Sequence, residues 1–198
     1  MKPYSESCDQ NREPILGVIA PLFADRSGVL EIGSGTGQHA LYFGGRLPHL
    51  TWHPSDREEN LRGIRLWLAE GAPPNVRDPL LLDVTQAVWP VPVVDAVFSA
   101  NTAHIMHWPM VRRMFEGVAR LLPPGGLFAL YGPFNYGGAY TSESNARFDL
   151  WLKQRDPDSA IRDFEALDEL ARAGGMALLH DHPMPANNRT LCWVKGRG

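Results

Sequence analysis

Apolar residues along the chain follow two spacings, one typical of helices and one typical of buried strands. Where they recur every three or four positions, the spacing predicts amphipathic helices. These helices are expected over residues 11–23, 38–47 and 161–173, and around residues 61–68, 111–122 and 148–152. Short apolar runs without that spacing predict strands over residues 29–32, 50–53, 79–82, 96–99, 127–131, 176–180 and 190–195.

Strands and helices alternate over most of the chain, which predicts an α/β fold with a mostly parallel sheet and helices on both faces. The last two strands are joined by a turn-rich connection at 184–188, which favours an antiparallel hairpin. Residues 132–144 are too irregular to assign. With 198 residues, 44% of them hydrophobic, and no repeat or linker, we expect residues 1–198 to form one domain.

The strongest chemical signal is a glycine loop directly after the first predicted strand. Gly33, Gly35 and Gly37 alternate with Ser34 and Thr36. Glycine at alternate positions lets the backbone turn sharply and approach a ligand where a Cβ would collide. The helix that follows offers free N–H groups to that ligand. A lone tight turn is the competing interpretation.

The residues around this loop favour S-adenosylmethionine (SAM) over a dinucleotide. The dinucleotide fingerprint needs a further glycine where this chain has Gln38. Glu31 precedes the first glycine, and its carboxylate would repel a pyrophosphate but attract a sulfonium and an ammonium. No Lys-Ser/Thr pair follows the glycines, which excludes a Walker nucleotide loop.

Acids also end the second and third predicted strands. Asp56 is placed to accept hydrogen bonds from both ribose hydroxyls of the cofactor. Asp83 is placed to accept a hydrogen bond from the exocyclic amine of adenine, while Val84 donates its backbone N–H to the same base. The alternatives are that Asp56 only caps the following helix and that Asp83 only caps a loop.

Net charge and composition limit the classes of partner that the protein is expected to bind. The formal charge is −3, and basic residues are scattered among acids, with Arg112-Arg113 the densest basic stretch. This argues against non-specific nucleic-acid binding and favours a small or neutral substrate, although RNA held locally by shape stays open. No apolar run approaches a bilayer span, and residues 1–14 lack the apolar region of a signal peptide. We expect a cytoplasmic protein with Cys8 and Cys192 as free thiols, a disulfide between them being the alternative.

The order of these motifs resembles class I SAM-dependent methyltransferases across nearly the whole chain. The E-x-G-x-G-x-G loop, the acids after strands two and three, the Pro-Gly-Gly before strand five and the late hairpin carry this resemblance. More closely, the chain resembles the methyltransferase-like 26 family, formerly described as a domain of unknown function. The matching segments are residues 11–16, 33–39, 52–56, 101–108, 130–134 and 184–188.

The resemblance implies a single-domain Rossmann-like fold and SAM as cofactor. The implied sheet has seven strands in the order 3-2-1-4-5-7-6, with the last strand antiparallel. It implies little about the substrate. Relatives carry an Arg-Asn pair at the start of the first helix, whereas this chain has Gln10-Asn11-Arg12. Which of these side chains reaches the site therefore stays open.

Catalytic groups in such sheets lie beyond the carboxyl ends of the strands, which selects residues 101–108 and 131–140. His104 is a candidate general base for an oxygen or nitrogen nucleophile, or it only shapes the cofactor pocket. Asn101 is a candidate for both catalysis and cofactor binding. Tyr136 is a candidate catalytic residue and Asn135 a candidate substrate ligand, with Tyr131 beside them as an apolar wall. The tyrosines could equally be plain packing.

Further polar residues complete the predicted site. His39, just past the glycines, is expected near the methionine end of the cofactor. Asn11 and Arg12 are candidate substrate ligands, and a solvated Arg12 is the alternative. His180 and His182 flank an aspartate, but no third ligand is placed, so we expect no metal.

We therefore predict a SAM-dependent methyltransferase acting on an unidentified, small-molecule acceptor. The runner-up is a SAM-binding partner or regulatory protein that has lost its chemistry. A nicotinamide oxidoreductase is disfavoured by Gln38 and Glu31. Homodimerisation is left open.

Overall fold

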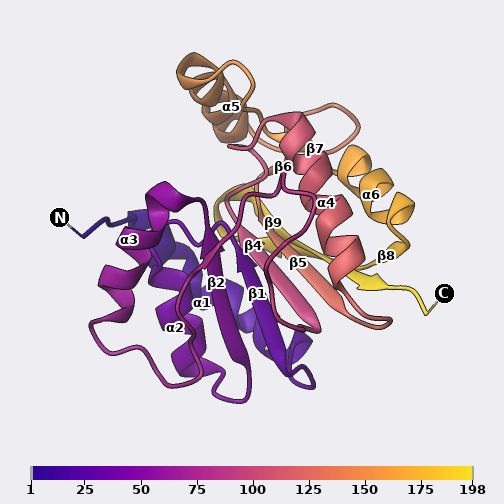
Figure 1. Ribbon diagram of the computed structural model, residues 1–198. Coiled ribbons are helices and arrows are strands. Elements are labelled where there is room, and N and C mark those ends of the chain that lie inside the picture. The colour runs from indigo at the N-terminus through magenta and orange to yellow at the C-terminus, as the bar shows by residue number, and fades with distance from the viewer. Residues whose placement is uncertain (1, 198) are drawn as a thin grey trace. The chain divides into compact units, whose positions relative to one another are not determined.

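The structure is a computed structural model that describes residues 2–197 (Figure 1). The chain divides into two compact units, residues 1–99 and 100–198, and each is described here by itself. Both cysteines, Cys8 and Cys192, are free thiols, as expected.

The first unit carries the first three helices and the first four strands. Its elements are α1 (Glu6–Leu22), β1 (Gly28–Ile32), α2 (Gln38–Arg46), β2 (Thr51–Asp56), α3 (Glu58–Leu68), β3 (Leu80–Leu81) and β4 (Ala96–Ala100). β1 pairs in parallel with β2 and with β4, and β2 pairs in parallel with β3. Within this unit, α2 contacts α1, α3 and β2 (Figure 1).

The second unit carries the remaining helices and strands. Its elements are α4 (Trp108–Leu121), β5 (Leu127–Gly132), β6 (Phe134–Asn135), α5 (Glu143–Arg155), β7 (Arg162–Asp163), α6 (Phe164–Ala173), β8 (Met176–Met184), a 3₁₀ turn η1 (Pro185–Asn187) and β9 (Asn188–Lys195). β9 runs antiparallel to both β5 and β8. The short strands β6 and β7 form a separate parallel pair.

The predicted fold class is confirmed. The main sheet has seven strands in the order β3-β2-β1-β4-β5-β9-β8. Counting only these seven strands along the chain gives 3-2-1-4-5-7-6, the predicted order, with the late hairpin antiparallel.

Aromatic rings fill the core of each unit. In the first, Phe43 lies 5.6 Å from Trp52 and 5.5 Å from Phe98, centroid to centroid, and all three side chains are fully buried. In the second, Phe128 lies 5.6 Å from Trp193 in a stacked arrangement. Such rings remove large apolar areas from water, so they hold the strands whose ends carry the polar residues described next.

Several element boundaries differ from the sequence prediction, and three of them concern segments described below. Helix α1 begins at Glu6 rather than at residue 11, because its first turn is polar and offers no apolar spacing to detect. Strand β2 continues through Pro54 to Asp56, since β1 pairs with it as far as Ser55 and β3 pairs with Ser55 and Asp56. The helix expected from residue 161 begins at Phe164, because Arg162 and Asp163 instead form β7 against Phe134 and Asn135.

Candidate functional site

The glycine loop begins where the carboxyl ends of β1 and β2 lie side by side. Ile32 at the end of β1 is paired with Ser55, the residue before Asp56. The backbone N–H groups of Gly33 and Ser34 both donate to the Ser55 carbonyl, each at 3.0 Å. The parallel register of β1 and β2 thus brings the loop beside the acid that was predicted from their separate strand ends.

Two glycines of the loop differ in the space and backbone conformation that a side chain would meet. Gly37 has a φ of 92°, and a Cβ there would lie 3.0 Å from the Ile64 Cα, so both conformation and space require glycine. Gly35 has a φ of 57° but a Cβ there would meet no atom within 4 Å. Gly35 is therefore open on the side where a side chain would project, which is the side that a ligand can approach.

Asp56 is bound by three donors. Its Oδ2 accepts from the Gly35 N–H at 2.7 Å, and its Oδ1 accepts from the Arg57 N–H at 2.8 Å and from Asn60 Nδ2 at 2.9 Å. The N-cap of α3 is Arg57, so Asp56 is not the helix cap that was the alternative. A carboxylate has about four lone-pair positions. To accept both ribose hydroxyls, Asp56 must therefore release one of its present donors.

Glu31 lies beneath the loop, and its side chain accepts from Trp52 Nε1 at 2.9 Å. The residue is only 2% exposed. Burial raises the pKa of Glu31 to about 7; hydrogen bonds from Trp52 and Ser34 oppose the rise, and the charge of Asp56 adds to it. Near neutral pH this carboxyl group is therefore divided between its protonated and ionised forms.

A cavity of about 460 Å³ opens beside the loop within the first unit. Gly35 and Thr36 form one wall of it, Asn60 and Gly63 of α3 another, and Pro3 of the N-terminal segment a third. The loop therefore faces space on the α3 side as well.

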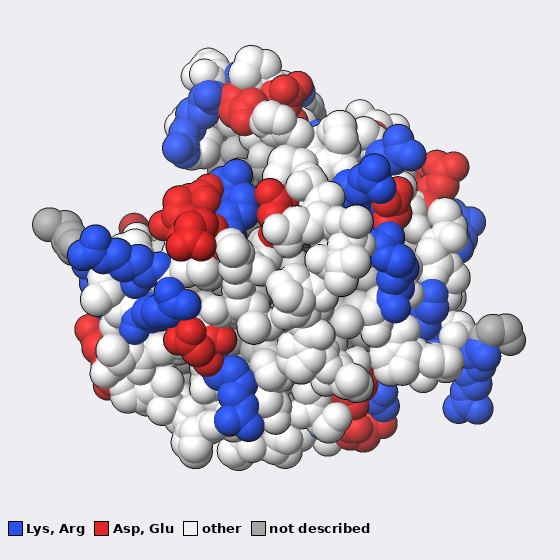
Figure 2. Space-filling model, viewed as in Figure 1, with Lys and Arg blue, Asp and Glu red and all other residues white. Residues whose placement is uncertain are grey.

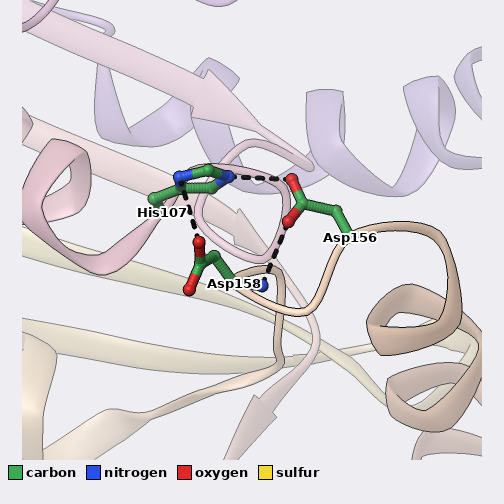
Figure 3. A group of neighbouring side chains, drawn as sticks. All are labelled: His107, Asp156 and Asp158. Carbon is green, nitrogen blue, oxygen red and sulfur yellow. Dashed lines mark hydrogen bonds and ion pairs between the residues drawn. The ribbon is translucent and has the colours of Figure 1, made fainter.

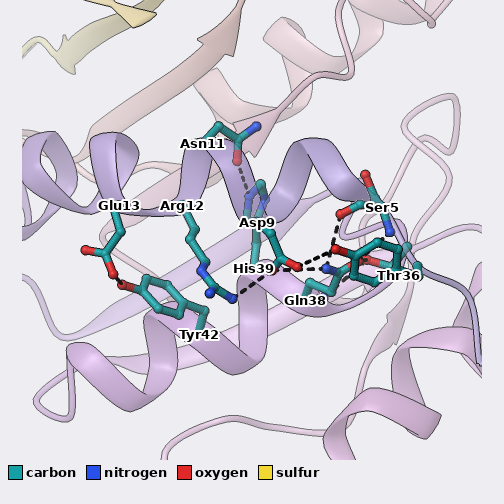
Figure 4. Close-up of polar contacts among 10 residues, drawn as sticks. Ser5, Asp9, Asn11, Arg12, Glu13, Thr36, Gln38, His39 and Tyr42 are labelled. Atoms are coloured by element: carbon teal, nitrogen blue, oxygen red, sulfur yellow. Dashed lines mark hydrogen bonds and ion pairs between the residues drawn. The ribbon is translucent and has the colours of Figure 1, made fainter.

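Gln38, which stands where a dinucleotide loop would have glycine, attaches the N-terminal segment to the loop (Figure 4). Its Oε1 accepts from the Ser5 N–H at 2.7 Å and from Thr36 Oγ1 at 3.0 Å, while its Nε2 donates to the Ser5 carbonyl at 3.2 Å. Further along, Trp67 Nε1 donates to the Pro3 carbonyl at 2.6 Å. The chain from Pro3 to Ser5 is thereby fastened between α3 and the start of α2.

We expect Gln38→Ala to loosen this segment. Each lost hydrogen bond contributes about 0.5–1.5 kcal/mol, so the free energy of unfolding should fall by about 1–2 kcal/mol. Limited proteolysis followed by mass spectrometry should show faster cleavage before residue 9. Gln10→Ala, which removes only a contact with Glu6 on the exposed side of α1, is the matched control. Equal cleavage of the two variants would contradict the role given to Gln38.

His39 and Asn11 form a buried polar pair between α2 and α1 (Figure 4). His39 Nε2 lies 2.7 Å from Asn11 Oδ1, and its ring stacks on Phe43 at 5.1 Å. Burial lowers the pKa of His39 to about 4, so the imidazole is neutral at physiological pH. Both residues were predicted at the site, and the structure brings them together.

Arg12 points elsewhere on α1. Its Nη1 donates to Asp9 Oδ1 at 2.7 Å, and its guanidinium lies 4.8 Å from the ring centroid of Tyr42 (Figure 4). Its role as a substrate ligand stays a prediction, and in this structure its charge is paired with Asp9.

Asp83 is engaged in its own turn. Its Oδ1 accepts from the Thr85 N–H at 2.9 Å and from Thr85 Oγ1 at 2.7 Å, and these bonds lower the pKa of Asp83. This is the loop-capping contact that was the alternative for this residue. The following residue, Val84, is buried. Adenine binding by Asp83 and Val84 stays a prediction.

The segment after β4 begins with a residue in a strained conformation. Asn101 has a φ of 58°, a region that residues other than glycine seldom adopt, and its N–H donates to the Tyr131 carbonyl at 2.9 Å. Asparagine adopts this region more often than most residues other than glycine, and such conformations cluster at functional sites. This conformation is an independent reason to keep Asn101 among the candidates.

His104 follows in the same segment and is buried. Burial, and then the charge of Arg162, lowers the pKa of His104 to about 4. Its ring packs edge-on against Phe148 of α5 at 5.3 Å. Within residues 2–197, neither ring nitrogen of His104 has a hydrogen-bond partner. The imidazole is therefore a neutral group with an unused proton-accepting nitrogen.

The candidates near the end of β5 divide into free and engaged groups. Asn135 is buried, and its Oδ1 is a fully buried acceptor with no donor. Tyr136 instead donates its hydroxyl to Asp181 Oδ2 at 2.8 Å; burial, and then this contact with Asp181, raises the pKa of Tyr136. Tyr131 is buried in β5. Asn135 is thus free to accept a ligand donor, whereas the Tyr136 hydroxyl is already bonded.

One set of side chains has ligand types suited to a metal (Figure 3). His107 Nε2 lies 2.8 Å from Asp156 Oδ2, and His107 Nδ1 lies 3.6 Å from Asp158 Oδ2. One ligand atom from each of the three residues lies within 4.8 Å of the others, and Figure 3 shows the two carboxylates on different sides of the ring. Of these two contacts, only the one between His107 Nε2 and Asp156 Oδ2 is a hydrogen bond. His180 and His182, considered from the sequence, lie 5.2 Å apart on β8.

Charges of both signs are interspersed on the face drawn in Figure 2. Arginines pair with acids near them, as in Arg65 with Asp78 and Arg113 with Glu116, each at 3.0 Å. That face therefore offers no continuous basic stripe for a phosphate backbone. Among residues 2–197, no helix combines the length and the apolar character that crossing a membrane requires.

The same fold occurs in solved methyltransferase structures. An O-methyltransferase family protein from Burkholderia thailandensis matches with a TM-score of 0.84 and 17% identity, over 98% of this chain and 58% of that one. Human N-acetylserotonin methyltransferase in complex with SAM matches with a TM-score of 0.82 and 15% identity, over 96% and 53%. An O-methyltransferase family 2 protein from Planctomyces limnophilus in complex with apigenin matches with a TM-score of 0.74 and 18% identity, over 96% of this chain and 61% of that one.

At these identities the likeness establishes the class I methyltransferase fold, and this chain spans between half and about three fifths of the length of the three proteins. A match to a protein family covers nearly the whole chain, from residue 2 to residue 195. The chain belongs to the family described as proteins of unknown function, DUF938.

Proposed function

We propose that this protein is a SAM-dependent methyltransferase acting on a small-molecule acceptor. We further propose that residues 1–198 form one SAM-binding domain related to the methyltransferase-like 26 family. The observation that carries the proposal is the loop Gly33–Gly37, which is open at Gly35 and held at that residue by Asp56. A cytoplasmic location and a homodimer stay predictions.

The residues around the loop fit SAM in their chemistry. Two carboxyl groups, Glu31 and Asp56, lie at the loop, where they suit a ligand with cationic groups and a sugar diol. Neither would suit a pyrophosphate, and Gln38 fills the position that a dinucleotide loop gives to glycine. The acceptor oxygens and the open face at Gly35 therefore support this cofactor over nicotinamide nucleotides.

We assign a role in binding to each candidate. Asp56 would accept the ribose hydroxyls, and Asp83 with Val84 would hold adenine. Glu31 and His39, with the loop backbone at Ser34, would hold the methionine end, and Asn101 would complete the cofactor contacts. Asn11, Arg12, Asn135 and Tyr131 are proposed for the acceptor. Bound SAM supplies a methyl group activated by positively charged sulfur.

His104 is proposed as the general base. Its neutral imidazole has a free nitrogen to take the proton that an oxygen or nitrogen nucleophile loses. Asn135 Oδ1, buried without a donor, would accept a hydrogen bond from an acceptor molecule that carries O–H or N–H. Tyr136 would act in catalysis only after its hydroxyl leaves Asp181.

A SAM-binding protein without catalysis is the second candidate. The Tyr136 hydroxyl, which already donates to Asp181, is compatible with such a protein. Both functions require the same cofactor site, so binding alone does not distinguish them.

We expect catalysis to depend on pH through His104. The base must be neutral, and a histidine is neutral above its pKa, so kcat/KM should be flat above about pH 5. Below the pKa of about 4 the rate should fall about tenfold per pH unit. His104→Asn should lower kcat by about 10²–10⁴. His180→Asn on β8 is the control, and an equal loss in both variants would remove His104 from the mechanism.

Two measurements test the proposed function. Isothermal calorimetry with S-adenosylhomocysteine should detect binding to the wild-type protein; no binding would overturn the proposal. Tritiated methyl transfer from labelled SAM into an extract of the source cells should label a small-molecule fraction. Label in protein or nucleic acid would overturn the acceptor class, and binding without any labelled product would favour the protein without catalysis.

A further inference from the structure

The segment that carries His104 is held through its own backbone by a segment about fifty residues later. Four successive carbonyls, from residue 103 to residue 106, each accept a hydrogen bond from residues 159–162. The donors are, in order, Arg162 Nε to Ala103 at 3.1 Å, the Ala160 N–H to His104 at 3.0 Å, Ser159 Oγ to Ile105 at 3.0 Å and Arg162 Nη2 to Met106 at 2.5 Å.

Arg162 supplies the two outer bonds of this set. Its Nη2 also donates to the Asp158 carbonyl at 2.9 Å. All of these acceptors are backbone carbonyls, although arginine in proteins commonly pairs with carboxylates. The guanidinium is planar and presents its N–H groups in a fixed fork, so it can reach on both sides of residue 104 at once. A lysine, with one compact ammonium, cannot span the same two carbonyls.

The backbone of Arg162 is also held in place. It lies in β7, paired with Phe134 of β6, and its guanidinium is 5.9 Å from the ring centroid of Trp108. Burial lowers its pKa, whereas the charges of Asp149 and Asp158 raise it. A half-buried cation that donates to two carbonyls of one loop restricts the position of that loop.

We propose that Arg162 is the positioning residue for His104, which it holds by bridging the carbonyls of Ala103 and Met106. As a statement about catalysis, this rests on the proposed function. As a statement about the loop, it rests on the contacts above alone. Arg162 does not touch the reacting atoms in this proposal and acts only through residues 103–106.

The charge of Arg162 has a second effect on the same imidazole. After burial, it is the cause that lowers the pKa of His104. Other charged groups near the loop are Asp149 on α5, which accepts from the Ile161 N–H and pairs with Lys153, and Asp156 and Asp158, which contact His107. Removing the cation should therefore raise the pKa of His104, whereas replacing it with lysine should not.

Two variants separate the fork from the charge. Arg162→Met removes both, and Arg162→Lys keeps the charge and loses the fork. Arg113→Met, on the exposed side of α4, is the control. The amides of Ile105 and Met106 donate to the Thr102 carbonyl, so hydrogen exchange at these two sites reports on the order of the loop.

We expect both Arg162 variants to speed this exchange by about tenfold or more, with the control unchanged. NMR titration of His104 should show its pKa raised by about half a unit to one unit in Arg162→Met and unchanged in Arg162→Lys. In methyl transfer, kcat should fall about 10–100-fold in both variants with little change in the KM for SAM, because misplaced groups lose rate rather than cofactor affinity.

The outcomes are distinct. Wild-type exchange in both variants overturns the positioning role, whatever the activity. Full rescue of exchange and kcat by Arg162→Lys also overturns it, because charge alone would then suffice. Faster exchange in a protein that never transfers methyl supports the positioning of the loop and refutes the proposed function instead. If Arg162→Met fails to fold, Arg162→Lys carries the test.

Discussion

Gly35→Val is expected to abolish SAM binding while residues 1–99 keep their fold. A Cβ at this position meets no atom within 4 Å in the protein itself, and the cost that the structure shows is the φ of 57°, which β-branched residues seldom adopt. For a residue other than glycine that conformation costs about 1–2 kcal/mol. A ligand resting on the loop, however, would meet the isopropyl group directly. We expect the dissociation constant for S-adenosylhomocysteine to rise at least about 100-fold.

Two controls make this test specific. Gly45→Ala lies in α2, where a Cβ also meets nothing within 4 Å, and it should leave binding unchanged. Gly37→Ala places its Cβ 3.0 Å from the Ile64 backbone and should lower the free energy of unfolding more than Gly35→Val does. Calorimetric titration and urea unfolding of the three variants give the comparison. If Gly35→Val binds as the wild type does, the cofactor does not lie on this loop.

The parts of the fold that sequence predicts are those with a local signature. The strands and most helices follow from periodic apolar positions, and the loop Gly33–Gly37 follows from its spacing after a strand. Asp56 could be placed because two parallel strands end at one edge, and the pairing of Ile32 with Ser55 confirms that adjacency. The strand order came from the resemblance to class I methyltransferases rather than from periodicity.

What escaped prediction involves contacts between residues far apart in the sequence. Arg162 binds the carbonyls of Ala103 and Met106, and a carbonyl is present at every residue, so nothing in the sequence marks those two. In the sequence Gln38 indicates only that a glycine is absent, whereas in the structure its amide binds Ser5. Tyr136 looked available because the partner that binds its hydroxyl, Asp181, lies on β8.

Local hydrogen bonding separates the candidate residues that keep a free acceptor from those that do not. Asn135 and His104 were chosen for their residue types, and the structure leaves an unused acceptor on each. Arg12 and Asp83 were chosen in the same way, but neighbouring groups in their own turns already bind them. A polar residue at a strand end is therefore a candidate ligand only if its nearest neighbours leave it a free donor or acceptor.

Glu31 should make both stability and cofactor binding depend on pH. Its pKa is raised from 4.5 to about 7 in the folded protein. Between these values the folded state holds a proton that the unfolded state has lost, so stability falls as pH rises through that window. The whole shift corresponds to about 3 kcal/mol, present below pH 4.5 and lost above about pH 7. Urea unfolding at pH 5, 6.5 and 8 measures it.

Glu31→Gln should remove this dependence. The amide oxygen still accepts from Trp52 Nε1 but does not titrate. The stability of the variant relative to the wild type should therefore rise by about 2.5 kcal/mol between pH 5 and pH 8. Glu116→Gln, at an exposed position on α4, is the control and should follow the wild-type curve. Parallel curves for wild type and Glu31→Gln would contradict the raised pKa.

Cofactor binding should also depend on the protonation of Glu31. If the positive groups of SAM lie near Glu31, they favour its ionised form, so binding near pH 6.5 should release a proton. The calorimetric enthalpy should then vary with the ionisation enthalpy of the buffer in the wild type and not in Glu31→Gln. Affinity should rise as pH increases through about 7 and level off above it, because the carboxyl is then already ionised. Binding with no proton exchange would show that Glu31 supports the loop through Trp52 without sensing the charge of the cofactor.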